Sequence, residues 1–309
     1  MAAVIQANKL NKSFRFGKIK AVTNLDLEVK EGEVYGFLGR NGSGKTTTIN
    51  LLMGLLRQNS GEAYLLGCSS KELSKAVLEQ IGFVSEGINM PNIKVGKLIK
   101  TIAGFYPTWD DKYATELLSE FKLPENMKVK ALSRGMNLKL KLLLALSYRP
   151  KLLILDEPFS GIDAVAKQDF MDNMVETLNR TKTTMLFSSH EIEDVERLAD
   201  RIGIIENGTI ALNSSVESLK SSFRRIKCVI NEDIKVIPVT EVISVKKASG
   251  ITEFIVSRNP DEAIAGLVAA GAKDIEPAGM DLREIFIAYE RYLECKNTAP
   301  LKSNNGEKI

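Results

Sequence analysis

The sequence has few of the residues that build disulfide frameworks and zinc sites. Its three cysteines, Cys68, Cys228 and Cys295, lie far apart and in no paired spacing. This pattern excludes a disulfide scaffold and a zinc signature, and it fits a reducing cytosol. Histidine is rarer still, because His190 is the only one among the 309 residues.

Long hydrophobic runs and strong charge are also missing. The longest apolar runs, around Leu142 to Leu146 and Leu152 to Leu155, are far shorter than the ~20 residues that span a bilayer. The first residues lack the charged start and apolar core of a signal peptide. The net charge is only +3, and lysine and arginine are scattered along the chain. We therefore expect a chain that does not cross a membrane by itself and does not bind nucleic acid.

A glycine-rich loop carries the first functional signal. Val34 to Leu38 is an apolar segment typical of a strand, the loop 39–46 follows directly, and residues 46–56 have helical composition. Strand, loop and helix is the order that a P-loop requires: backbone N–H groups converge on phosphate oxygens, Lys45 reaches the β- and γ-phosphates, and the Thr46 hydroxyl ligates Mg²⁺. The sequence therefore predicts binding of ATP or GTP with Mg²⁺. The predicted nucleotide contacts of this segment are Gly39, Arg40, Asn41, Gly42, Ser43, Gly44, Lys45, Thr46 and Thr47.

Two adjacent acids end a second apolar strand. Asp156 and Glu157 follow the run Leu152 to Leu155, as expected where a strand buried on both faces reaches the ligand-binding edge of a sheet. In phosphoryl transfer one acid holds Mg²⁺ and another group orients the attacking water. We predict Asp156 for the first task and Glu157, as general base, for the second. The alternative is that the two acids only cap the next helix.

The single histidine follows the next predicted strand. Thr184 to Ser188 has the composition of a strand, and residues 169–178 before it are helical in pattern, so the chain predicts a strand-helix-strand unit of a parallel sheet. A lone histidine is usually incidental. Here, however, His190 is expected at the same sheet edge as Asp156, within reach of a γ-phosphate.

Ser133 and Gly135 open a helical run rich in leucine and lysine. A serine at a helix start exposes its hydroxyl, and the helix dipole favours an anion there. Taken alone, this is only a capped helix.

Together these motifs resemble the nucleotide-binding subunit of an ATP-binding-cassette (ABC) transporter over about residues 4–220. Residues 39–46 match the Walker A motif, and residues 152–157 match Walker B with its catalytic glutamate. Residues 132–136 lie where the family signature falls. The resemblance implies that Ser133 and Gly135 meet the γ-phosphate bound by a partner subunit.

Further positions gain roles from the same resemblance. Asp163, in Ser160-Gly161-Ile162-Asp163, resembles the D-loop aspartate, and His190 resembles the switch histidine. Phe16 resembles the aromatic residue that stacks on adenine, with Phe14 as the second candidate. A place in the core is the alternative for either phenylalanine.

The chain departs from the family pattern at three positions. The usual signature is Leu-Ser-Gly-Gly-Gln, but Arg134 replaces its first glycine and Met136 its glutamine. Glu86 stands where the family commonly has the Q-loop glutamine. A carboxylate at Glu86 can still bind the nucleotide's Mg²⁺ or orient water, but it adds negative charge near the phosphates.

The resemblance implies an α/β fold, the P-loop NTPase fold of ABC ATPases, over residues 1–220. This domain has an antiparallel β subdomain and a helical subdomain at about residues 88–148. A polar, basic linker at residues 221–225 precedes a small α+β domain at residues 223–294, and the polar tail 295–309 is predicted to be disordered. Strands of the small domain are expected at Ile226 to Ile230, Ile234 to Val245 and Thr252 to Val256, and helices at Asp261 to Ala270 and Leu282 to Leu293.

The resemblance also implies a function. Two chains, in a homodimer or a heterodimer with a second cassette, bind ATP head to tail, hydrolyse it, and power a separate integral membrane permease. Such a subunit is cytoplasmic and peripheral on the inner face of the membrane. Residues 105–110 and 280–286 resemble bacterial single-cassette subunits of export-type transporters, which by analogy suggests efflux of a drug, peptide or other small compound.

Two other functions stay open at this stage. A soluble ABC ATPase acting on DNA or ribosomes carries two cassettes or a long coiled coil between Lys45 and the signature. This chain has one cassette and a short stretch from Lys45 to Ser133, which disfavours that function. A regulatory nucleotide sensor with little turnover is favoured by Arg134 and Glu86.

Overall fold

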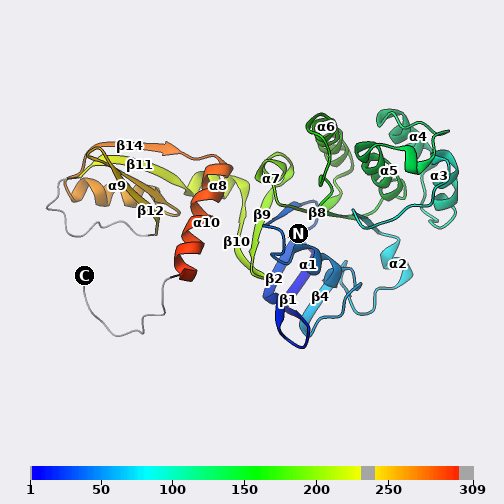
Figure 1. The fold of residues 1–309 in the computed structure, drawn as a ribbon, viewed down its shortest axis with the longest axis horizontal. Helices are drawn as coiled ribbons and strands as arrows, with labels where there is room; N and C mark the ends of the chain where they lie inside the picture. Colours follow the sequence, from blue (N-terminus) through cyan, green and yellow to red (C-terminus); the bar gives the residue numbers. More distant parts are fainter. Residues whose placement is uncertain (1, 231–240, 299–309) are drawn as a thin grey trace. The chain divides into compact units, whose positions relative to one another are not determined.

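The computed structural model describes residues 2–230 and 241–298. The chain divides into two compact units, Met1–Ser214 and Ser215–Ile309, and each is described by itself (Figure 1). Within the described ranges, no helix is long and apolar enough to span a bilayer.

A six-stranded sheet forms the centre of the first unit, in the order β10-β9-β3-β8-β7-β6. Strand β3 pairs in parallel with β8 and β9, and β7 pairs in parallel with β6 and β8. Every residue of β3, β7 and β8 is buried, as expected for parallel strands covered on both faces. The bounds are β3 Val34–Leu38, β6 Ile81–Ser85, β7 Leu152–Asp156, β8 Thr184–Ser189, β9 Arg201–Glu206 and β10 Thr209–Ser215.

A four-stranded antiparallel sheet, in the order β2-β1-β4-β5, covers one side of this core. Helix α1 (Lys45–Leu52) contacts strands of both sheets, and its buried residues join their hydrophobic cluster. The strands are β1 Ala3–Phe14, β2 Ile19–Lys30, β4 Ser60–Leu65 and β5 Cys68–Ser69. We did not predict β4 from the sequence, because its residues include no β-branched side chain.

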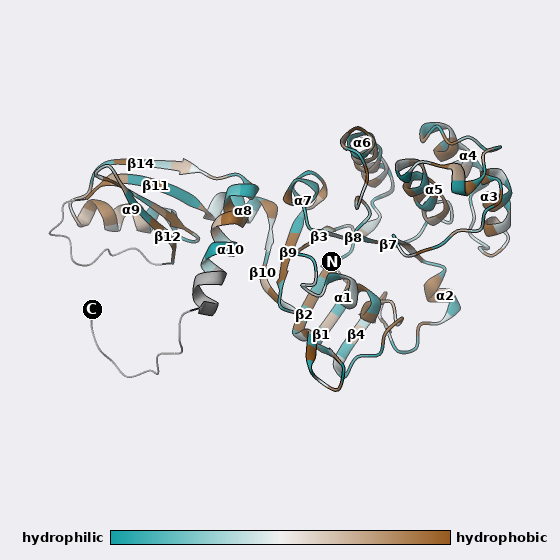
Figure 2. Cartoon of the chain, in the orientation of Figure 1, coloured by the Kyte–Doolittle hydropathy of each residue, from teal (hydrophilic) through white to brown (hydrophobic). Residues whose placement is uncertain are grey.

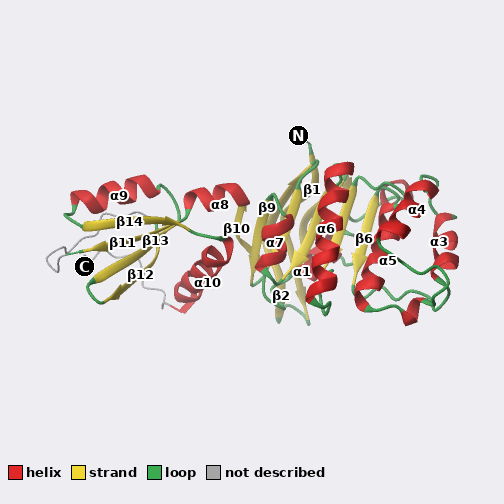
Figure 3. Cartoon of the chain, turned by 90° about the horizontal axis from the view of Figure 1, so that it is seen from above, coloured by secondary structure: helices red, strands yellow, loops and turns green. Residues whose placement is uncertain are grey.

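Helices α6 (Ala164–Thr181) and α7 (Ile192–Leu198) lie on the opposite side of the six-stranded sheet from α1 (Figures 1 and 3). Helix α7 contacts β3 and β8, and α6 contacts α7. In Figure 2 the helices alternate between brown and teal, as expected when one face is buried and the other faces water.

The helical pattern predicted from about Ile93 to Tyr148 is confirmed as a set of short helices. Helix α5 contacts α3, α4, α6 and strand β6, so it joins this region to the main sheet. The helices are α2 Lys75–Leu78, which precedes the region, and α3 Val95–Ala103, α4 Asp111–Glu120, the 3₁₀ turn η1 Val129–Ala131 and α5 Arg134–Leu146.

The second unit has an antiparallel sheet in the order β12-β13-β11-β14. Its hydrophobic cluster joins Ile226, Cys228 and Phe254 of the sheet to Ala263 and Leu267 of helix α9. The elements are α8 Val216–Ser222, β11 Arg224–Val229, β12 Val242–Ala248, β13 Ile251–Val256, α9 Pro260–Ala269, β14 Lys273–Gly279 and α10 Leu282–Thr298.

Three expectations for this unit change. The predicted linker 221–225 was wrong, because these residues end α8 and begin β11. Residues 295–298 of the predicted disordered tail are helical, because α10 continues to Thr298; residues 299–309 lie outside the described residues. Most of the predicted strand Ile234 to Val245 also lies outside them, and β12 accounts for its last residues.

Candidate active site

The loop 39–46 joins β3 to α1, and its backbone demands glycine. Gly44 has φ 114°, and a Cβ atom there would lie 2.5 Å from the carbonyl oxygen of Ala21. A Cβ atom on Gly39 would lie 2.5 Å from the carbonyl oxygen of Ile205. The Gly39 N–H donates to the carbonyl of Ser189 at 3.2 Å, so β8 holds the start of the loop. This close backbone packing leaves no room for a side chain at either glycine, as a loop that approaches phosphate through its backbone requires.

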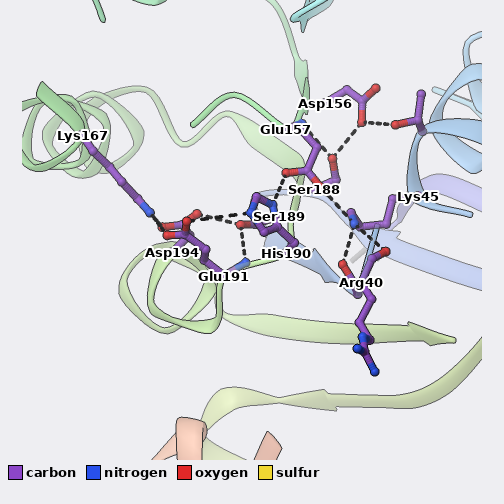
Figure 4. A network of polar contacts seen from close by, with 12 residues as sticks. Arg40, Lys45, Asp156, Glu157, Lys167, Ser188, Ser189, His190, Glu191 and Asp194 are labelled. Carbon is purple, nitrogen blue, oxygen red and sulfur yellow. Dashed lines mark hydrogen bonds and ion pairs between the residues drawn. The ribbon is translucent and has the colours of Figure 1, made fainter. Parts of the chain in front are cut away.

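Lys45 lies inside this loop with only 5% of the residue exposed. Its Nζ donates to the carbonyl oxygens of Gly39 at 2.5 Å and Arg40 at 3.2 Å. The same Nζ lies 2.9 Å from Glu157 Oε1. Figure 4 shows the ammonium group between the loop carbonyls and this carboxylate. A buried cation with these partners is placed to take up a phosphate oxygen.

Asp156 ends β7 and is 5% exposed. Its Oδ1 accepts hydrogen bonds from Ser188 Oγ at 2.8 Å and Thr46 Oγ1 at 3.1 Å. Burial raises the pKa of the Asp156 carboxyl. A carboxylate beside a threonine hydroxyl is an oxygen donor set that suits Mg²⁺, so these residues fit the metal that the sequence predicts.

Glu157 lies between Lys45 and His190. Its Oε2 is 2.9 Å from His190 Nδ1, and its backbone N–H donates to Ser188 Oγ at 2.9 Å. Its φ of 48° is in the left-handed region, a conformation that costs of the order of 1 kcal/mol and concentrates at functional sites. Helix α6 is capped by Asp163, so Asp156 and Glu157 do not cap the next helix.

Ser188 is a site residue that our sequence analysis missed. Its hydroxyl donates to Asp156 and accepts from the backbone of Glu157, so it ties the two acids to β8. The available signal was a pair of serines ending an otherwise apolar strand, directly before His190.

The predicted signature residues begin α5. Ser133 is the N-cap, and its Oγ accepts from the N–H of Met136 at 3.2 Å. Gly135 packs against α6, since a Cβ atom there would lie 2.9 Å from Ala166 Cβ. Arg134 Nη1 donates to the carbonyl oxygen of Gly161 at 3.2 Å. The start of α5 therefore lies beside the loop that precedes α6.

Asp163, Glu86 and Phe16 lie on three separate segments of the first unit. Asp163 Oδ1 accepts from the N–H of Ala166 at 2.9 Å, so it has a capping role in any case. Glu86 is exposed and follows Ser85, which pairs with Asp156 across β6 and β7. Phe16 is fully exposed in the turn between β1 and β2, so the alternative of a core position for it is wrong.

A pocket of about 210 Å³ lies between α5, β6 and the end of β7. Lys141 Nζ lies at its wall and donates to the carbonyl oxygens of Ser85 at 2.9 Å and Glu86 at 3.3 Å. Burial lowers the pKa of Lys141. The charged residues lining the pocket are Glu86, Arg134, Lys141 and Glu157.

We expect that replacing Asp156 with asparagine stabilises the nucleotide-free protein and lowers Mg²⁺-dependent ATPase activity at least about a hundredfold. Asparagine keeps an oxygen acceptor for the two hydroxyls but has no charge to desolvate. Because burial raises the pKa of Asp156 above its usual 3.8, the folded protein binds this proton more tightly, and ionisation above the folded pKa costs stability. The gain in melting temperature should be largest near pH 7 and shrink as the pH falls through the folded pKa. Calorimetry of both proteins at pH 5 and pH 7 tests this. A melting temperature of Asp156→Asn below that of the wild type at pH 7 would contradict it.

Comparisons with known proteins agree on one family. The sequence matches the family model described as ABC transporter over residues 22–160, which include the loop 39–46 and both acids. It is 29% identical over 286 residues to the ABC transporter ATP-binding protein YtrB of Bacillus subtilis (strain 168), covering 92% of this chain and 97% of that one. It is 33% identical over 229 residues to the bacitracin transport ATP-binding protein BcrA of Bacillus licheniformis, covering 73% and 74%.

The fold is similar to that of solved ATP-binding cassettes. The dimeric post-hydrolysis structure of the cassette MJ0796 bound to ADP and Pi superposes with a TM-score of 0.60 at 23% identity. The match covers 68% of this chain and 98% of that one.

Proposed function

This chain belongs to the ATP-binding subunits of ABC transporters, and we propose that two cassettes, each with this arrangement, close head to tail on two ATP molecules to power a separate membrane permease. The chain is an ATPase of this family. The observation that carries the proposal is the contact chain Lys45–Glu157–His190 beside the pair Asp156–Thr46.

Within one chain, this cluster supplies groups for binding and for hydrolysis. Lys45 binds the β- and γ-phosphates, and Glu157 accepts the proton of the attacking water as general base. The ion pair with Lys45 at 2.9 Å holds the Glu157 carboxylate in place. His190, 2.9 Å from Glu157, steadies that carboxylate and lies where it can reach the transferred phosphoryl group.

Thr46 and Asp156 would hold Mg²⁺, with Glu86 as an additional ligand or water-orienting group. The metal, when bound, neutralises charge on the phosphate oxygens. The Asp156 carboxylate is held ready for it by the Ser188 hydroxyl. Glu86 lies one residue beyond the strand that neighbours Asp156, which supports this assignment.

The remaining nucleotide contacts come from two places. Phe16, exposed in its turn, would stack on adenine. Ser133, exposed at the N-cap of α5, and Gly135 would cover the γ-phosphate held by the partner chain, with Asp163 at the same dimer face. The capped helix start offers an anion its N–H groups and dipole.

We propose export as the direction of transport and a drug, peptide or similar compound as the cargo. The support is the relative that transports bacitracin and the sequence features shared with export-type subunits. The subunit would then lie on the cytoplasmic face of the membrane, held there by its permease.

The test is steady-state ATPase activity of the purified protein, with and without its detergent-solubilised permease. A motor subunit should show a turnover that the permease stimulates several-fold. Slow turnover that the permease leaves unchanged would favour the regulatory sensor instead. Transport of labelled bacitracin-like peptides in inverted vesicles would then test the cargo.

A further inference from the structure

His190 lies between two residues that are held firmly. Ser189 Oγ donates to Asp194 Oδ2 at 2.6 Å and accepts from the N–H of Glu191 at 3.0 Å. The carbonyl of Ser189 accepts from Gly39 at 3.2 Å. The backbone on both sides of His190 is therefore tied to the start of α7 and to the phosphate-binding loop (Figure 4).

One side chain from α6 joins this segment. Lys167 Nζ pairs with the carboxylates of both Glu191 and Asp194, and it lies 5.6 Å from the ring centroid of Phe159. The Asp194 side chain is only 2% exposed and that of Lys167 18%. A buried carboxylate is costly unless it is paired. Lys167 therefore offsets the cost of burying Asp194, whose carboxylate also accepts the hydrogen bond from the Ser189 hydroxyl.

Lys167 is also one helical turn from the loop that precedes α6. Its backbone N–H donates to the carbonyl oxygen of Asp163 at 3.0 Å, and Asp163 caps the helix. The first turn of α6 thus runs from Asp163 to Lys167, whose side chain pairs with the two acids that flank the His190 segment.

We propose that Lys167 is a positioning residue for hydrolysis: with Asp194 and Glu191 it holds His190 against Glu157, and it links that geometry to the Asp163 loop. The proposal rests on the roles proposed above for His190 and Glu157. Lys167 does not touch the reacting atoms in this arrangement. It acts through the two carboxylates that flank and fix the histidine segment.

The chain offers a matched control on the same pair of helices. Arg197 of α7 contacts Gln168 and Asp172 of α6. It therefore also joins α6 to α7, but through residues other than Ser189 and Glu191. Loss of Arg197 tests whether helix packing alone matters.

The experiment compares ATP turnover of five variants of the full chain, assembled with its permease. We expect Lys167→Met to lower kcat at least about tenfold, since small misplacements of a reacting group cost up to about a hundredfold. The KM for ATP should stay within about twofold, because the phosphate-binding loop is intact. Lys167→Arg should recover most of the activity, and Arg197→Met should stay within about twofold of wild type.

The double variant Lys167→Met/Asp194→Asn separates positioning from stability. Removing both charges eliminates the unpaired buried carboxylate, so the melting temperature should recover relative to Lys167→Met while kcat stays low. Recovery of kcat along with the melting temperature would overturn the proposal, because Lys167 would then only neutralise a charge. An equal loss of kcat in Arg197→Met would overturn it as well.

His190→Ala, assayed beside them, keeps this proposal distinct from the proposed catalytic cluster. If His190→Ala is inactive and Lys167→Met has normal kcat, only the positioning role fails. If His190→Ala keeps normal turnover, the role proposed for the histidine fails, and the positioning role that depends on it is overturned too.

Discussion

Glu157→Gln should slow ATP hydrolysis about a hundredfold, the low end of the contribution of a general base, while ATP binding is retained. The amide has nearly the shape of the carboxylate, but it cannot take a proton from water. It also loses the ion pair with Lys45 that the carboxylate makes at 2.9 Å, which leaves the lysine to the phosphates. Turnover at saturating ATP measures the first effect. Light scattering should show a dimer that persists with ATP because hydrolysis no longer reopens it.

Glu31→Gln is a suitable control for this variant. Glu31 is an exposed acid in the turn before β3, and its loss should leave turnover unchanged. Near-normal turnover in Glu157→Gln would rule out Glu157 as the base and would shift attention to Glu86, the other acid in the neighbouring pocket.

Ser133→Arg should also lower turnover about a hundredfold, as expected when a phosphate-stabilising group is lost, while a single chain still binds ATP. The side chain is exposed at the start of α5, so arginine fits the isolated chain and fills the place of the partner's phosphate. Loss of the cap costs about 1 kcal/mol, which a melting curve would show. Ser119 is an exposed serine of α4 in the same helical region. Ser119→Gln and Ser119→Ala serve as controls, and their turnover should be unchanged.

A mixture of the two inactive variants tests the shared site directly. A mixed dimer of Ser133→Arg with Glu157→Gln contains one site with an intact Glu157 from one chain and an intact Ser133 from the other. If chains assort at random, half of the dimers are mixed, and turnover should return to about a quarter of the wild-type value. A mixture as inactive as its components, or a monomer that hydrolyses ATP at full speed, would contradict a site built from two chains.

The sequence predicts the structure best where that structure follows from neighbouring residues. The P-loop lies between β3 and α1 in the expected order, and Asp156 ends a buried strand as predicted. The parallel pairing of β7 and β8 also followed from the strand-helix-strand pattern. That pairing alone was enough to expect His190 near the two acids.

The sequence is less informative where a role depends on residues far apart in the chain. Nothing in the local pattern of Lys167 distinguishes it from other lysines on an amphipathic helix, yet it pairs with Asp194 and Glu191 of α7. Ser188 likewise gains its role only by lying across from Asp156 in the sheet. Strand β4 was missed because its pairing with β1, and not its composition, makes it a strand.

Chain order alone was enough to identify the phosphate-binding loop and the acid-ended strand, because a glycine turn and a buried strand end are local properties of backbone sterics and hydrophobic pattern. Packing in three dimensions was needed to place the Glu157 carboxylate between Lys45 and His190 and to pair Lys167 with buried Asp194. These contacts join separate strands and helices, and the energy of a charge depends on which charges and how much water surround it after folding.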